Sequence, residues 1–192
     1  IPLPASPLSI LPNTQFLLQD ALRSVLYQLG YVEVQTYSLQ DSGDIQLKNA
    51  LAEDKQYLRR DLSRGVRGAL DKNEQNAAFF GEYDAIKIFE IGHTFTGSLE
   101  NSVEEVHLCI GARPLGAKKK DIRTNDLLAQ AIAALKASIP SLCDGTRDVD
   151  THEFSLQPII ESGIEIKESP LPIVQSDMQY TPLSPFPGML RD

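Results

Sequence analysis

The chain has 192 residues, of which 42% are hydrophobic and 23% charged, and its formal net charge is −8. This length and composition are those of a soluble globular protein with one domain, with or without a small appendage, and no apolar run approaches the roughly 18 residues of a membrane span. The negative charge argues against a nucleic-acid clamp, because such binding depends on cationic contacts to phosphate.

Four prolines stand within residues 1–12, IPLPASPLSILP. Proline fixes φ and lacks an N–H donor, so this segment predicts an extended linker. It has neither a basic region nor a continuous apolar core, and it is therefore not typical of a signal peptide. Because the chain begins with Ile and not with Met, we expect it to be a piece of a longer protein.

Residues 15–29 have the spacing of a helix with one apolar face. Asn13 or Thr14 can cap its start, and Gly30 can take the left-handed conformation that often ends a helix. Residues 31–39 then alternate and predict a strand. The apolar stripe of the helix consists of Leu18, Leu22, Val25, Leu26 and Leu29.

A second helix is predicted after Leu58, followed by a strand at residues 86–95. The strand segment is rich in β-branched and aromatic residues and alternates between its two sides. In the helix, one face carries Leu62, Val66, Ala69 and Leu70. In the strand, Lys87, Phe89, Ile91, His93 and Phe95 share one side, and Ile86, Ile88 and Glu90 share the other.

The second half of the chain continues with more strands and one clear helix. Residues 96–105 are polar and predict a hairpin loop, and residues 106–112 predict the returning antiparallel strand. The helix is expected at residues 126–138, with Thr124 or Asn125 as its cap and Pro140 as its stop. Further strands are expected at residues 154–160, 163–168 and 171–174. Together these elements predict an α+β fold, with a mainly antiparallel sheet flanked by helices.

Two segments resemble one family, the bacterial-type phenylalanine–tRNA ligase beta subunit, in its core module shaped like a class II synthetase. One segment combines Leu58-Arg59 with Leu62, Gly65 and Asn73, and is followed by Phe89-Glu90-Ile91-Gly92. The other contains Gly30, Tyr31, Glu33, Val34, Tyr37 and Ser38. The chain departs from the family at Asp61, where a small Ser is usual, and at Arg67, where an apolar residue is usual.

The resemblance also implies a division of the chain. Residues 1–12 correspond to a linker from a preceding domain, and residues 13–180 to a non-catalytic class II synthetase-like core. Residues 181–192, TPLSPFPGMLRD, resemble the start of the linker to a C-terminal anticodon-binding domain with a ferredoxin-like fold.

No catalytic, cofactor or metal residues are predicted. An active class II synthetase needs an arginine just after the FEIG-type strand, because guanidinium groups stabilise the charge that develops on phosphate oxygens. This chain has Thr94, Phe95 and Thr96 there, and it has no late Gly-rich segment ending in Arg. The histidines lack the spacing of metal ligands. Cys109 and Cys143 are expected to be reduced thiols of a cytoplasmic protein.

Three groups of residues have two possible roles. Arg23 and Tyr27 are candidates for a subunit interface, since the helix at residues 15–29 occupies the place of class II motif 1; alternatively, that helix only packs on its own sheet. Arg59 and Glu90 are candidates for a buried structural ion pair; alternatively, both are solvated. Lys118, Lys119 and Lys120 could touch RNA, but a solvated turn is favoured.

The resemblance implies a function for the core domain as a scaffold. The family's beta subunit joins a catalytic alpha subunit in an α2β2 enzyme that attaches phenylalanine to its tRNA with ATP and Mg²⁺. The fragment alone is expected to be inactive, to meet tRNA only through the full complex, and to self-associate when alone. Two alternatives remain open: a stand-alone RNA- or effector-binding module, and a diverged ATP-dependent acyl-transfer enzyme.

Overall fold

The computed structural model describes residues 13–50, 52–79, 83–116 and 121–162. Several predictions from the sequence lie outside these residues. They are the linkers at both ends, the lysines at 118–120, and the strands expected at residues 163–168 and 171–174.

The first helix is confirmed as α1, Thr14–Gln28. The side chain of Asn13 accepts hydrogen bonds from the backbone N–H groups of Gln15 and Phe16, at 3.0 and 3.4 Å, and so caps the helix start. Gly30 has a φ of 78°, the left-handed conformation expected after the helix end. Leu18, Leu22 and Leu26 are fully buried and hold α1 on the sheet.

The continuous strand predicted at residues 31–39 is wrong. Only β1, Val32–Glu33, joins the main sheet, where it runs parallel to β4. Beyond β1 the backbone leaves the sheet, and Thr36 there donates to the buried Glu90 through its N–H group and its hydroxyl. The chain then forms β2, Leu39–Gln40, which pairs with β3, Tyr57–Leu58, in a separate antiparallel ribbon.

The second helix is confirmed as α2, Ser63–Gln75, and a short 3₁₀ turn, η1 (Ala77–Phe79), follows it. Leu62 lies at its start, and Leu62, Val66 and Leu70 are fully buried against the sheet. The apolar stripe seen in the sequence is therefore the face that α2 packs.

The hairpin that follows is longer than predicted. β4, Ala85–Gly97, and β5, Ser102–Pro114, pair along their whole length, so only residues 98–101 remain for the turn. Gly97 has a φ of 95°, which lets the chain turn directly after the last residue of β4. The polar residues assigned to a loop instead lie on an exposed ribbon, where alternation with apolar residues is not required.

The last described segment contains α3, Thr124–Ser138, as predicted. Its predicted side-chain cap is wrong, because the helix begins at Thr124 and the residue before it, Arg123, makes no capping bond through its side chain. Next come β6, Thr146–Arg147, and β7, Thr151–Ser155.

The strand predicted at residues 154–160 is correct only at its start, because the chain turns into α4, Gln157–Ser162. The backbone N–H groups of Ile159 and Ile160 donate to the carbonyl of Leu156, each at 3.1 Å. Leu156 and Ile159 are buried, so their separation of three residues places both on the core side of this turn.

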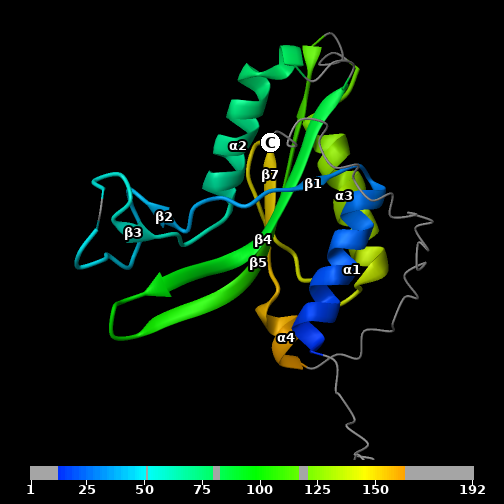
Figure 1. Cartoon of the computed structure of the whole chain (residues 1–192). Coiled ribbons are helices and arrows are strands. Elements are labelled where there is room, and N and C mark those ends of the chain that lie inside the picture. The colour runs from blue at the N-terminus through cyan, green and yellow to red at the C-terminus, as the bar shows by residue number, and fades with distance from the viewer. Residues whose placement is uncertain (1–12, 51, 80–82, 117–120, 163–192) are drawn as a thin grey trace, which may run out of the picture.

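The five strands of the main sheet are ordered β1-β4-β5-β7-β6, and all pairs except β1–β4 are antiparallel. Figure 1 shows α2 on one side of the central strands and α1 with α3 on the other. One apolar cluster lies beneath α1, α3 and α4 and includes Phe89, and a second lies beneath α2 and includes Ile88. The predicted α+β architecture with a mainly antiparallel sheet flanked by helices is confirmed.

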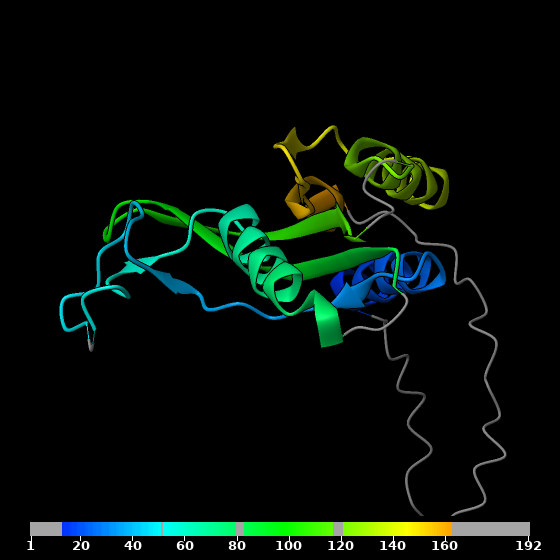
Figure 2. The same ribbon diagram turned by 90° about the horizontal axis from the view of Figure 1, so that it is seen from above.

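The far end of the β4–β5 hairpin and the β2–β3 ribbon project beyond the helices, as Figures 1 and 2 show. β7 pairs with β5 only from His107 to Gly111, so the hairpin end lies outside the five-stranded part of the sheet. Among the described helices, each is too short or too polar to span a bilayer.

Candidate functional site

Arg23 and Tyr27, the residues predicted at a subunit interface, meet at Glu33 on β1. The Nε–H of Arg23 donates to both carboxylate oxygens of Glu33, at 3.1 and 3.0 Å. The hydroxyl of Tyr27 donates to the same carboxylate at 3.0 Å. Sequence reasoning missed Glu33 as the residue that joins them, although it belongs to the segment that resembles the family. The Glu33 carboxylate therefore fixes the position of both side chains.

The surroundings of Arg23 and Tyr27 keep both side chains protonated. The hydrogen bond to Glu33 raises the pKa of Arg23, so the guanidinium stays charged. Partial burial and the same carboxylate raise the pKa of Tyr27, so its hydroxyl stays a donor. The Tyr27 ring also meets Phe89 of the core edge-on, with ring centroids 5.6 Å apart.

Four residues of α1 form a surface that we name the α1 outer face: Phe16, Asp20, Arg23 and Tyr27. They are spaced at zero, four, seven and eleven residues, which places them along one side of a helix. Phe16 is 62% exposed and Tyr27 is 51% exposed. Between these aromatic ends, Arg23 and Asp20 form an ion pair at 3.4 Å. The α1 outer face thus combines two exposed rings with one pair of opposite charges.

Arg59 and Glu90 lie together inside the molecule. Nη1 of Arg59 is 2.6 Å from Oε1 of Glu90, and their side chains are only 5% and 2% exposed. The Nε–H of Arg59 donates to the backbone carbonyl of His93 at 2.8 Å, and the backbone carbonyl of Arg59 accepts from the N–H of Phe95. The pair therefore joins the chain entering α2 to the outer half of β4.

Gly92 makes room for this ion pair. A Cβ atom at position 92 would overlap Nη2 of Arg59. Glycine therefore suits the last position of the FEIG segment, because the guanidinium of Arg59 occupies the space that a Cβ atom would need.

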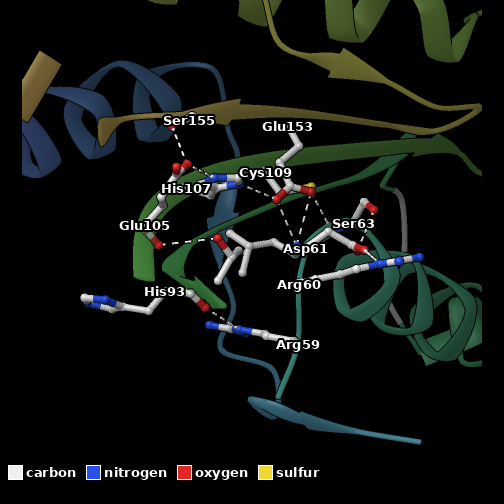
Figure 3. Close-up of polar contacts among 12 residues, drawn as sticks. Arg59, Arg60, Asp61, Ser63, His93, Glu105, His107, Cys109, Glu153 and Ser155 are labelled. Atoms are coloured by element: carbon white, nitrogen blue, oxygen red, sulfur yellow. Dashed lines mark hydrogen bonds and ion pairs between the residues drawn. The ribbon is translucent and has the colours of Figure 1, made fainter. Parts of the chain in front are cut away.

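A second polar cluster lies where β5 and β7 approach the start of α2 (Figure 3). His107 places Nδ1 2.8 Å from Glu153 and Nε2 3.1 Å from Glu105. Burial lowers the pKa of His107, but the hydrogen bonds to the two carboxylates raise it more, so its net pKa lies above the ordinary histidine value. Ser155 donates to Glu105 and completes the cluster.

Glu153 occupies the N-terminus of α2. Its carboxylate accepts from the backbone N–H groups of Leu62 and Ser63 at 3.0 to 3.1 Å. Asp61, where the family usually has Ser, accepts from the N–H of Arg64 and acts as a helix cap. Donors that could bind an external anion are therefore already bound to the chain's own carboxylates.

A pocket of about 450 Å³ lies beside this cluster. Its walls include carboxylates that are already paired, among them Glu153 with His107, and Asp144 with Lys136. Cys143 also lines it, and its thiol donates to the carbonyl of Ser155. Cys109 is buried nearby, and burial together with neighbouring carboxylates such as Glu153 raises the pKa of its thiol. Both cysteines are free thiols.

Among the residues that the structure describes, those expected near an ATP phosphate are already bonded within the chain. Thr94 is buried, and its hydroxyl donates to the carbonyl of Glu105 and not toward a ligand. The N–H groups at the start of α2 are occupied by Glu153. Within the described residues, no group of three or more His, Cys, Asp or Glu side chains is arranged to hold a metal ion.

The polar residues that sequence reasoning missed share one pattern. Glu105, His107, Glu153 and Ser155 alternate along two neighbouring strands, so they point to the same side of the sheet. Polar residues at every second position of otherwise apolar strands are the signal that could have placed this cluster on the α2 side. Thr36 carried no comparable signal.

Comparison with protein families decides the relationship of the chain. The family described as the phenylalanyl tRNA synthetase beta chain CLM domain matches residues 2–126. The chain belongs to this family. The family is a domain of a ligase subunit, and the match covers both segments that carry the resemblance in the sequence. No similar sequence is found among curated proteins.

Comparison with solved structures shows the fold of a class II aminoacyl-tRNA synthetase core. A pyrrolysyl tRNA synthetase from Desulfitobacterium hafniense is similar with a TM-score of 0.51 and 16% identity, over 79% of this chain and 68% of that one. The histidyl-tRNA synthetase of S. aureus gives a TM-score of 0.44 and 14% identity, over 73% of this chain and 40% of that one.

Proposed function

We propose that this domain is a non-catalytic scaffold of the phenylalanine–tRNA ligase beta subunit and binds the alpha subunit through the α1 outer face. The observation that supports the proposal is the combination of family membership with an exposed face on α1, the helix that the resemblance assigns to the motif 1 position. In this proposal the complete enzyme is a cytoplasmic α2β2 heterotetramer.

The α1 outer face has the composition of a binding surface. Aromatic residues and arginine are enriched where protein interfaces are fully buried. Phe16 and Tyr27 supply exposed rings, and Glu33 holds Arg23 and Tyr27 in place before a partner arrives. Side chains that are ordered in advance lose less conformational entropy on binding.

The proposal assigns the chemistry to the partner. ATP and Mg²⁺ would be bound by the alpha subunit, since the corresponding positions here carry Thr94, Phe95 and Thr96 and the α2 N-terminus holds Glu153. This domain would meet tRNA only within the full complex, in keeping with its net charge of −8.

Sedimentation velocity of the chain with the alpha subunit from the same organism tests the proposal. We expect a stable complex at micromolar concentration. Tyr27→Glu should weaken it at least tenfold, because the new carboxylate would be buried at the contact next to Glu33. Val149→Glu is the matched control: Val149 is 80% exposed in the β6–β7 connection, and its substitution should leave the affinity unchanged.

Two results would count against the proposal. Absence of any complex between the alpha subunit and a beta chain that contains this domain would overturn the scaffold role. A complex that Tyr27→Glu and Val149→Glu affect equally would overturn the placement of the contact on α1.

A further inference from the structure

The pocket beside Glu153 has room for a ligand. Its volume of about 450 Å³ lies within the roughly 300–1,000 Å³ that is usual for small-molecule sites. Figure 3 shows the residues that the start of α2, β5 and β7 contribute to it. The segment from Cys143 to Asp148, which includes β6, forms the rest of its walls. A ligand there would touch parts of the chain that are distant in sequence.

Four carboxylates line the pocket, and each of them is bonded within the chain. Asp144 and Asp148 each form an ion pair with a cation outside the pocket lining. Asp61 and Glu153 accept from backbone N–H groups at the start of α2. The carboxylates and the donors of the α2 N-terminus therefore satisfy one another, and the ligand has to be recognised by other groups.

Arg60 and Arg147 are the two arginines of the pocket, and both keep unused donors. The side chain of Arg60 is 64% exposed, and its ion-pair partners Asp44 and Asp61 lie 3.8 and 3.9 Å away, beyond the length of a hydrogen bond. Arg147 is exposed and donates through Nη2 to the neutral amide of Asn125. A guanidinium has five N–H donors, so both arginines can bind an acceptor in the pocket.

We propose that this pocket binds a small molecule through its phosphate group, and that Arg60 and Arg147 bind the phosphate oxygens. Arginine suits this role because its planar fork matches two oxygens at once and stays charged. Thr146, which is exposed and precedes Arg147 on β6, adds a hydroxyl to the same wall. The proposal is independent of the scaffold role, because α1 and α2 lie on opposite sides of the central strands (Figure 1).

The charge of the chain favours a small ligand over a nucleic acid. A nucleic acid brings many phosphates, and a net charge of −8 repels such a polyanion. A single phosphate group needs only the two arginines. Thr94, which stands where an active class II synthetase needs its arginine, does not line the pocket, so this site differs from the ATP-phosphate position of those enzymes.

Isothermal titration calorimetry with inorganic phosphate and with glycerol 3-phosphate is the first test, and sodium chloride at equal ionic strength is the blank. We expect saturable binding with one ligand per chain. Tighter binding of glycerol 3-phosphate would identify a phosphate monoester as the ligand, and equal binding would identify inorganic phosphate. No saturable binding of either probe at millimolar concentration overturns the proposal.

The variants Arg60→Gln and Arg147→Gln should each weaken binding by about tenfold, because each removes charge-assisted hydrogen bonds to the phosphate. Both side chains are exposed, so the fold should be kept, which thermal unfolding checks. Arg64→Gln is the matched control: Arg64 also lies at the start of α2, but it pairs with Asp41 and does not line the pocket. Equal losses in all three variants would indicate a general effect of charge and overturn the site.

Alkylation of Cys143 by iodoacetamide locates the bound phosphate independently. Cys143 lines the pocket and is partly exposed, whereas Cys109 is fully buried. A saturating probe should slow the alkylation of Cys143 severalfold in the parent chain and in Arg64→Gln, and much less in Arg147→Gln at the same concentration. An unchanged rate with the probe bound would place the phosphate elsewhere and overturn the proposal.

The outcomes separate this proposal from the scaffold proposal. A chain that binds the alpha subunit but neither phosphate probe overturns the phosphate site alone. A chain that binds the probes in this pocket but forms no complex with the alpha subunit overturns the scaffold role alone.

Discussion

Arg59 makes hydrogen bonds to three residues in two segments that are distant in the chain, the one around Thr36 and strand β4. Its guanidinium donates to the carboxylate of Glu90, to the backbone carbonyl of His93, and to the carbonyl and hydroxyl of Thr36. Removing one member of such a buried pair leaves the other charge without compensation, which is far more costly than the net value of the pair.

Replacing Glu90 by Gln should therefore lower the free energy of unfolding by about 3–5 kcal/mol. Arg59 would stay charged and buried, with only neutral acceptors. Urea denaturation of the variant and of the parent chain measures the difference.

Arg64→Gln is the control for this prediction. It removes another arginine from an ion pair with Asp41 at 2.6 Å, but both side chains there are about half exposed, so water screens the pair. The loss for Arg64→Gln should be much smaller. Equal losses for the two variants would mean that the buried pair has no special role in stability.

The sequence predicts only part of the hydrogen-bonded cluster around Arg59. Arg59 and Glu90 are charged residues within otherwise apolar motifs, and this pattern is enough to predict that they form an ion pair. Thr36 cannot be predicted in this way, because it lies 54 residues before Glu90 in a segment that reads as plain strand. At Thr36 the backbone N–H donates to the side chain of Glu90 and not to a strand partner, and β1 has only two residues.

At the scale of elements, amphipathic spacing predicts the three long helices well because each packs one face on the sheet. It fails at α4, where apolar residues at 154, 156, 159 and 160 fit a strand as far as 156 and a helix beyond it. The length of the strands also could not be predicted from the sequence. The β4–β5 ribbon continues into solvent, where no buried face imposes an apolar pattern.

The packing of α2 on the sheet depends on a glycine of β5. A Cβ atom at Gly111 would lie 2.7 Å from Cγ1 of Val66 and 3.1 Å from Cδ1 of Leu70. Both side chains are fully buried and have little room to move. Gly111→Ala should therefore push α2 away and lower the free energy of unfolding by about 1–3 kcal/mol.

Gly68→Ala makes the same chemical change in the middle of α2 and should have the opposite effect. A Cβ atom there would meet nothing within 4 Å. Alanine inside a helix is favoured over glycine by about 0.5–1 kcal/mol, so this variant should be more stable. Thermal unfolding of both variants gives the two signs, and a stabilising Gly111→Ala would contradict the close packing of α2.

At the scale of the whole molecule, the sheet separates two apolar clusters, and polar residues fix α2 to it. Glu153 on β7 holds the N-terminus of α2, and His107 on β5 holds Glu153 and Glu105. The link from β5 through β7 to α2 therefore includes one histidine whose charge depends on pH.

His107 should make the stability of the molecule depend on pH in a defined direction. Its pKa in the folded chain is raised above the ordinary value of 6.5, so the folded state binds the proton more tightly than the unfolded state. The stabilisation is complete below the ordinary value and is lost as the pH rises through the raised pKa. The difference in unfolding free energy between the parent chain and His107→Gln should follow this curve from pH 5.5 to 9.

A titration followed by NMR checks the cause separately from the stability. His107 should titrate above 6.5, and His152 should titrate below it, because burial and the nearby Arg147 and Lys136 lower the pKa of His152. The two histidines are three residues apart in register on neighbouring strands, so they share a sheet but differ in their neighbours. A stability difference that grows with rising pH, or a His107 that titrates below His152, would show that the carboxylates do not hold an imidazolium at the junction of β5, β7 and α2.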